Sequence, residues 1–262
     1  MIRAYWSEWW KIRRPGMILG GAGTMIGFAV LAVVLMLSRL DRARGGPGAD
    51  VLTAAQLATS NGFATLITIS ATFMGVIALA ICAVAVGMEY STGSLRNLLV
   101  RQPARLRLLA GKLLALGSFI ALAVVLAYGS ALATALLLAP GHGISTAAWF
   151  TTAGVQSLLS TAGNLLLATL AWGAIGAVLA TVLRSTAAAI AGGLAYVLVA
   201  ENLLTAVWSD GKQWLPGQLI NALAHGGTSA VSYPSALALV GLYLVVALSA
   251  ASSLFRRRDV AA

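Results

Sequence analysis

Residues 156–208 read QSLLSTAGNLLLATLAWGAIGAVLATVL, then Arg184-Ser185, then TAAAIAGGLAYVLVAENLLTAVW. The first part has no charged residue and the second has one, Glu201. A helix needs about 20 apolar residues to cross the hydrocarbon core of a bilayer, which is about 30 Å thick. We therefore expect two spans joined by a tight helical hairpin at Arg184-Ser185. The alternative, one unbroken helix of about 50 residues, would overrun that core.

Runs of this kind occur along the whole chain of 262 residues, at 17–38, 62–87, 112–138, 156–183, 186–208 and 235–255. Hydrophobic residues make up 60% and charged residues 9%, against about 25% charged in a soluble domain. The sequence predicts an all-α integral membrane protein with six transmembrane helices in one domain, 1–262. The net charge of +10 does not indicate a nucleic-acid partner, because the basic residues cluster at span ends.

The distribution of Lys and Arg predicts the orientation. With both termini on one side, that side holds 13 of the 17 Lys and Arg residues. Short cytoplasmic segments carry such an excess, so we expect both termini in the cytoplasm. The first outer loop departs from the rule, since Arg39, Arg42 and Arg44 lie there.

Residues 1–15 predict a separate N-terminal element. On a helical wheel, Trp6, Trp9 and Trp10 fall on one arc, with basic residues beside it. We expect an amphipathic helix in the membrane interface, ended by Pro15-Gly16. The alternative is a simple aromatic anchor without a mechanical role.

The outer segment 209–234 is moderately apolar and contains Trp214, Pro216 and Pro234 as well as a Gly pair. This composition favours short interfacial or re-entrant helices before the last span, because irregular backbone needs polar partners at membrane depth.

Residues that would support an enzyme are missing from the sequence. Gly111-Lys112 is followed by Leu113, so no G-x-x-x-x-G-K-[ST] phosphate loop is present. The two histidines, His142 and His225, are in different outer loops, which gives no metal-binding spacing. We expect no catalytic residue, no cofactor and no metal in this chain.

Glu201 is the ionisable residue placed well within a predicted span, followed by Asn202. Such an acid is a functional candidate, so both residues are candidates for a substrate route or gate. The alternative is that the helix tilts or ends early, which would leave Glu201 at the outer interface.

Small residues favour close approach of helices in lipid. The first span contains Gly16-x-x-x-Gly20 and Gly23-x-x-x-Gly27, and the fifth opens with the small residues 185–193. These spans are candidates for contact with each other or with a second copy.

The loop 89–103 contains EYSTGSLR at 89–96, then Leu98-Leu99 and Gln102-Pro103. Ser94 is a helix-capping residue, and Pro103 ends the segment. Leu95, Leu98 and Leu99 form an apolar edge at i, i+3 and i+4. The loop therefore predicts a short amphipathic helix on the cytoplasmic side.

This loop, the later Gly111-Lys112 and the six-span layout resemble the permease subunits of type-2 ABC transporters, the bacterial exporter kind. The resemblance implies that the loop is a coupling helix docked on a separate ATP-binding subunit, which holds ATP and Mg. The implied contacts are Glu89, Gly93, Ser94, Leu95, Arg96, Leu98 and Leu99. It also implies an assembly of two identical permeases with two ATPases in the bacterial cytoplasmic membrane, and a central route beside the first, second and fifth spans.

The expected function is thus export of a lipophilic or amphiphilic substrate, such as a drug, a peptide antibiotic or a lipid. One alternative is an ion-coupled secondary transporter, although no inverted repeat is visible and intramembrane charges are scarce. The other alternative is a membrane anchor or assembly factor without transport activity.

Overall fold

The computed structural model describes residues 2–43, 53–91 and 105–257. These residues form helices and no strands, and six of the helices are long and apolar enough to cross a membrane. The six candidate spans are Pro15–Leu40, Ala71–Ser91, Leu106–His142, Thr152–Leu183, Thr186–Val207 and Tyr233–Arg256. The predicted all-α, six-span class is therefore confirmed.

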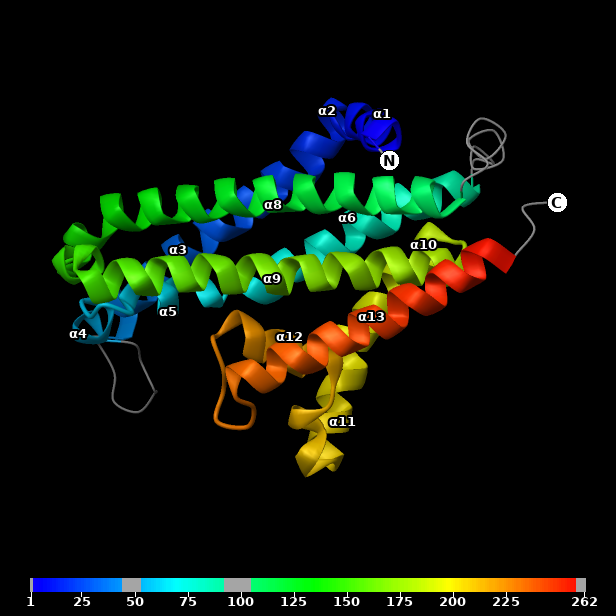
Figure 1. The fold of residues 1–262 in the computed structure, drawn as a ribbon. Coiled ribbons are helices and arrows are strands. Elements are labelled where there is room, and N and C mark those ends of the chain that lie inside the picture. The colour runs from blue at the N-terminus through cyan, green and yellow to red at the C-terminus, as the bar shows by residue number, and fades with distance from the viewer. Residues whose placement is uncertain (1, 44–52, 92–104, 258–262) are drawn as a thin grey trace.

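The helices follow one another in a simple order (Figure 1). Their bounds are α1 (Ile2–Ile12), α2 (Pro15–Met17), η1 (Ile18–Gly23), α3 (Thr24–Ala43), α4 (Ala54–Leu57), α5 (Gly62–Thr68), α6 (Ala71–Ser91), α8 (Arg105–Leu138), η2 (Ala139–His142), η3 (Ala147–Phe150), α9 (Thr152–Leu183), α10 (Thr186–Ala195), η4 (Tyr196–Ala200), α11 (Glu201–Val207), η5 (Ser209–Gln213), α12 (Pro216–Ala224) and α13 (Tyr233–Arg257).

Helices α6, α8 and α9 form the centre of the bundle, and α8 and α9 run side by side along its length (Figure 1). More than half of the apolar stretch of each is buried, at 56%. Glycine allows α6 and α9 to touch closely, because a Cβ on Gly176 would lie 2.2 Å from the carbonyl oxygen of Leu79. A Cβ on Gly75 would likewise meet the Trp172 ring at 2.2 Å. This α6–α9 contact is tighter than an Ala-to-Ala contact permits.

The second span begins later than the sequence predicts. The run 62–87 is not one helix, since α5 ends at Thr68 and α6 begins at Ala71. The buried hydroxyl of Ser70 donates to the Ile67 carbonyl oxygen at 2.6 Å, a local bond that competes with the helical ladder. Helix α5 instead packs Phe63 edge-on against the Tyr128 ring, with centroids 5.2 Å apart.

The hairpin between the fourth and fifth spans is confirmed. Helix α9 ends at Leu183, and Arg184 adopts the left-handed conformation with φ 54°. The Ser185 hydroxyl then accepts a hydrogen bond from the Ala188 N–H at 3.3 Å, which caps α10.

Within the described part of this chain, the Gly-x-x-x-Gly glycines of the first span make no close contact with the fifth span, and their contact with a second copy stays a prediction. A Cβ on Gly16, Gly20 or Gly27 would have no heavy atom within 4 Å. In the fifth span, by contrast, Gly193 packs on Leu79. The close helix contacts at glycine described above join α6 and α9 instead.

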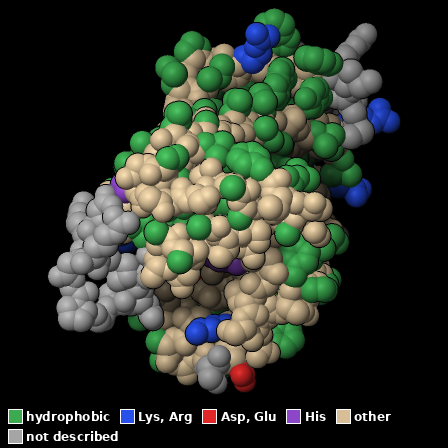
Figure 2. Space-filling view, turned by 90° about the vertical axis from the view of Figure 1, so that its left-hand side faces the viewer, with side chains coloured by type: hydrophobic (Ala, Val, Ile, Leu, Met, Phe, Trp, Pro, Cys, Tyr) green, Lys and Arg blue, Asp and Glu red, His purple; other side chains and the backbone are tan. Residues whose placement is uncertain are grey.

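The fifth and sixth spans lie at the edge of the bundle, and only 17% and 11% of their apolar stretches are buried (Figure 1). Leu203 and Val245 are among the large side chains exposed there. The end of the molecule that carries α4 and α5 has few charged side chains among the described residues (Figure 2). Both observations fit a protein whose surroundings are largely apolar.

Candidate functional site

The predicted docking loop is described only at its base. Residues Gly93, Ser94, Leu95, Arg96, Leu98 and Leu99 lie outside the described residues, as does the predicted two-turn helix. Glu89 is described and occupies the last turn of α6. It lies on the side of the molecule where α8 begins, so its contacts define how the loop is fixed.

Glu89 belongs to a charge cluster formed by Glu8, Lys11, Glu89 and Lys112. The Lys112 ammonium lies 2.5 Å from the Glu89 carboxylate and 3.3 Å from that of Glu8. The Lys11 ammonium lies 2.5 Å from Glu8 and 3.2 Å from Glu89. Two acids and two bases thus alternate in a closed, neutral cluster that joins α1, α6 and α8.

The charge cluster is mostly shielded from solvent. The side chains of Lys112 and Glu8 are 6% and 5% exposed, that of Glu89 is 13% exposed, and that of Lys11 is 40% exposed. Lys112 also donates to the Ala85 carbonyl oxygen at 3.1 Å. A buried charge is stable only when paired and hydrogen-bonded, which the geometry of Lys112 provides.

The charge cluster changes the acidity of its most exposed member. Burial lowers the pKa of Lys11, but hydrogen bonding and attraction by Glu8, together with Glu89, outweigh that effect and raise the pKa above its ordinary value of 10.5. Lys11 therefore stays protonated through the physiological range.

Helix α1 packs on α8 through one face. The hydroxyls of Tyr5 and Ser118 are 3.1 Å apart, and the half-buried Trp9 stacks on Tyr5. Trp6 and Trp10 are 54% and 67% exposed, so the arc of three tryptophans runs from the half-buried Trp9 outward to the exposed side of the helix. Trp6 and Trp10 are left available to a membrane surface, whose headgroup region favours Trp.

Glu201 lies at the first position of α11 and is 2% exposed. The helix continues past it to Val207, and the buried side chain packs against α12 of the outer segment. Whether Glu201 lies within the membrane or at its outer interface stays a prediction. One carboxylate oxygen, Oε1, accepts a hydrogen bond from the Gly217 N–H at 2.6 Å. The other, Oε2, lies 3.5 Å from the Gln218 side-chain nitrogen. Glu201 therefore caps α12, where its charge is favoured by the helix N-terminus.

The absence of a side chain at Gly217 makes this cap possible. A Cβ at this position would lie 2.2 Å from Oε2 of Glu201. The preceding Pro216 is at the first helical position, where a missing N–H costs nothing. Gly217 and Gln218 were not predicted as site residues. The one feature of the sequence that pointed to them is the Pro216-Gly217 pair, which opens a short apolar run.

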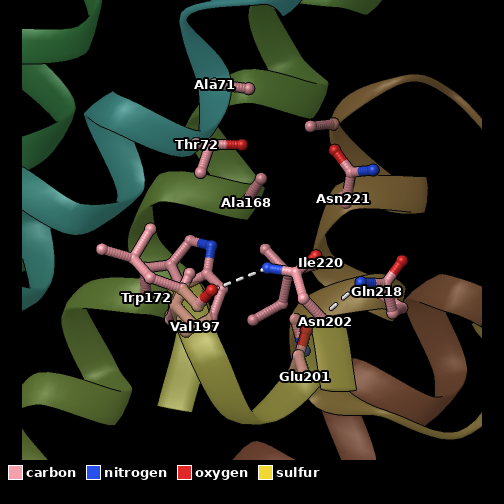
Figure 3. A pocket seen from close by; sticks show the side chains of 13 residues that line it. Ala71, Thr72, Ala168, Trp172, Val197, Glu201, Asn202, Gln218, Ile220 and Asn221 are labelled. Atoms are coloured by element: carbon pink, nitrogen blue, oxygen red, sulfur yellow. Dashed lines mark hydrogen bonds between the residues drawn. The ribbon is translucent and has the colours of Figure 1, made fainter. Parts of the chain in front are cut away.

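Glu201 and Asn202 both line a polar cavity of about 190 Å³ between α6, α9, α11 and α12. Figure 3 shows these side chains together with Thr72, Trp172 and Asn221. The Asn202 side-chain nitrogen donates to the Leu198 carbonyl oxygen at 2.9 Å. The structure thus brings both predicted route residues to one cavity.

The described residues offer no group of three or more His, Cys, Asp and Glu side chains that would hold a metal ion.

No curated protein matches the chain. A family model, described as protein of unknown function (DUF2705), matches residues 25–261. The match covers all six spans except the first residues of the first one. On that match, the chain belongs to the DUF2705 family of proteins of unknown function.

Proposed function

We propose that this chain is the membrane-spanning permease subunit of an ATP-driven ABC exporter, which moves a lipophilic or amphiphilic substrate. A separate subunit with a phosphate loop binds ATP and Mg and supplies the energy. The six apolar spans support the membrane part of this proposal. The family match adds no function to it.

The observation that carries the proposal is the charge cluster at the base of the predicted coupling loop. Glu89 precedes the segment 92–104 and Lys112 follows it, and their 2.5 Å ion pair holds the two flanking helices together. A force applied to a loop anchored in this way passes directly to α6 and α8. The ion pairs of Glu8 carry the same force to α1.

The length of α8 supports the same arrangement. Its 34 residues extend about 51 Å at 1.5 Å per residue, well beyond a ~30 Å hydrocarbon core. The first turns, which include Lys112, therefore project past the core on the side that carries the basic residues. A soluble partner therefore contacts this end of α8, outside the shielded charge cluster, without entering the bilayer.

The assembly we propose has two permeases and two ATP-binding subunits in a bacterial cytoplasmic membrane, with both termini of each permease in the cytoplasm. Poorly buried fifth and sixth spans leave apolar surface for a second copy or for lipid. An ion-coupled carrier is less favoured, because no inverted repeat is visible in the sequence and charged residues within the spans are scarce.

The experiment is purification of the tagged chain from its own host in mild detergent, followed by mass spectrometry of the complex. The proposal expects a protein with a phosphate loop in equal amounts. Replacing Leu98 by Asp places an unpartnered charge in the docking groove and should remove that protein, while the permease remains in the membrane. Val260→Asp is the matched control, since it adds the same charge to the C-terminal tail. Retention of the partner by Leu98→Asp would overturn the proposed docking site.

A further inference from the structure

Two cavities that differ in polarity share one wall of the bundle. The first is the polar cavity of about 190 Å³ that contains Glu201. The second has a volume of about 340 Å³, is lined almost entirely by apolar atoms, and lies between α9, α10, α12 and α13. Trp172 and Ile220 line both (Figure 3). The apolar cavity is within the size range of small-molecule sites.

The carboxylate of Glu201 has capacity for a further donor. A carboxylate has about four acceptor positions. The Gly217 N–H occupies one at 2.6 Å, the Gln218 amide is at the long limit of 3.5 Å, and the Tyr196 hydroxyl lies nearby. Within residues 2–43, 53–91 and 105–257, no ion pair reaches Glu201. The Glu201 carboxylate thus lies at the cavity wall without a Lys or Arg partner among these described residues.

The remaining walls of the polar cavity complement a cation. The side chains of Asn202, Gln218 and Asn221 bring amide oxygens, which accept hydrogen bonds from an ammonium group. Trp172 brings the aromatic ring that attracts cations most strongly. Beside this cavity, Gly192 leaves open space for an apolar chain between α10 and α13, because a Cβ there would have no heavy atom within 4 Å.

We propose that the two adjacent cavities bind a single-chain amphiphilic amine, with its protonated nitrogen beside Glu201 and its apolar chain in the neighbouring cavity. A single apolar cavity suits one chain, whereas a membrane lipid carries two. The inference that this amine binds depends only on the two cavities. The step from bound ligand to transported substrate rests on the proposed exporter function.

The test uses the full chain in phosphatidylcholine vesicles and an alkylamine brominated along its chain, which quenches tryptophan that it touches. The protein has seven tryptophans, so the quenching lost in Trp172→Phe isolates the signal of Trp172. We expect saturable quenching by the amine. The brominated alcohol of equal chain length should bind less tightly, because it lacks the charge that Glu201 attracts.

Two variants test separately the contact of the ligand's amine group and the contact of its apolar chain. Glu201→Gln should weaken the amine by roughly tenfold or more, the loss for one hydrogen bond to a charged group, and leave the alcohol unchanged. Gly192→Leu should weaken both ligands, since it fills open space in the apolar cavity. If Glu201→Gln does not fold, the wild-type preference for amine over alcohol and the Gly192→Leu result decide the question.

Equal affinity for amine and alcohol, or no saturable quenching of Trp172, would overturn the proposal. Loss of amine binding when phosphatidylethanolamine is added to the vesicles would assign the site to bilayer lipid and also overturn it. The assay contains no ATP-binding subunit. Failed binding with an ATPase that still responds to the permease would therefore refute this inference alone, and the reverse result would refute the exporter function alone.

Discussion

Replacing Lys112 by Met tests whether the charge cluster holds α1, α6 and α8 together. The Lys112 ammonium touches Glu89 at 2.5 Å and Glu8 at 3.3 Å, and its side chain is only 6% exposed. Its removal leaves two shielded carboxylates facing one lysine. Removing one partner of a buried pair costs about 3–5 kcal/mol, so we expect a loss in the free energy of unfolding of that order.

Lys11→Met is the matched control, because Lys11 contacts the same two carboxylates. Its side chain is 40% exposed, so solvent screens both of its pairs, and the two carboxylates stay paired with the buried Lys112 in this variant; the loss should therefore stay within about 1 kcal/mol. The measurement is reversible unfolding of the purified chain in mixed micelles, followed by tryptophan fluorescence. We expect the loss in the free energy of unfolding to be clearly larger for Lys112→Met than for Lys11→Met.

The double variant Lys112→Met with Glu89→Gln supplies a second check. It removes one positive and one negative charge, so that Glu8 and Lys11 remain as a neutral pair 2.5 Å apart. Because the penalty comes from an uncompensated charge, the double variant should recover part of the stability lost by Lys112→Met. Equal losses for Lys112→Met and Lys11→Met, or no recovery, would refute the reasoning.

Three further predictions concern packing, pH and topology. Gly176→Ala should destabilise the chain by about 1–3 kcal/mol in the same unfolding assay, because a Cβ there meets backbone at 2.2 Å. Gly163→Ala, on the same helix with no atom within 4 Å, should be neutral or stabilising. The raised pKa of Lys11 predicts stability that is fully present below pH 10.5 and is lost as pH rises through the higher folded-state value; a Lys11→Met chain titrated alongside should lack that loss. Reporter fusions at Ala262 and after Pro140 should report opposite sides of the membrane, and the same side would contradict six spans.

The spans could be predicted from the sequence because a bilayer imposes a length on every apolar helix. The helical hairpin between the fourth and fifth spans could also be predicted, since Arg184-Ser185 separates two apolar runs that are each long enough to cross the bilayer. The break before Ala71 was not visible, because single Thr and Ser residues such as Thr68 and Ser70 also occur within unbroken spans and the interruption involves one buried hydroxyl, that of Ser70.

The sites could be predicted only in part, because each is built by residues far apart in the chain. Lys11 and Glu89 are 78 residues apart, and nothing local to either indicates the ion pair. Glu201 was recognisable as an acid within a span, but its partner Gly217 lies 16 residues later. The contact requires the chain to return as α12, which periodicity does not reveal.

The most direct test of the central claim is the ATPase rate of the purified partner, measured alone and with this permease in vesicles. The account predicts that the permease changes the rate, that Leu98→Asp restores the rate of the isolated partner, and that Val260→Asp behaves like the wild type. An ATPase rate that is the same with and without the permease, or unaffected by Leu98→Asp, would contradict the claim that this chain is driven through its 89–103 loop.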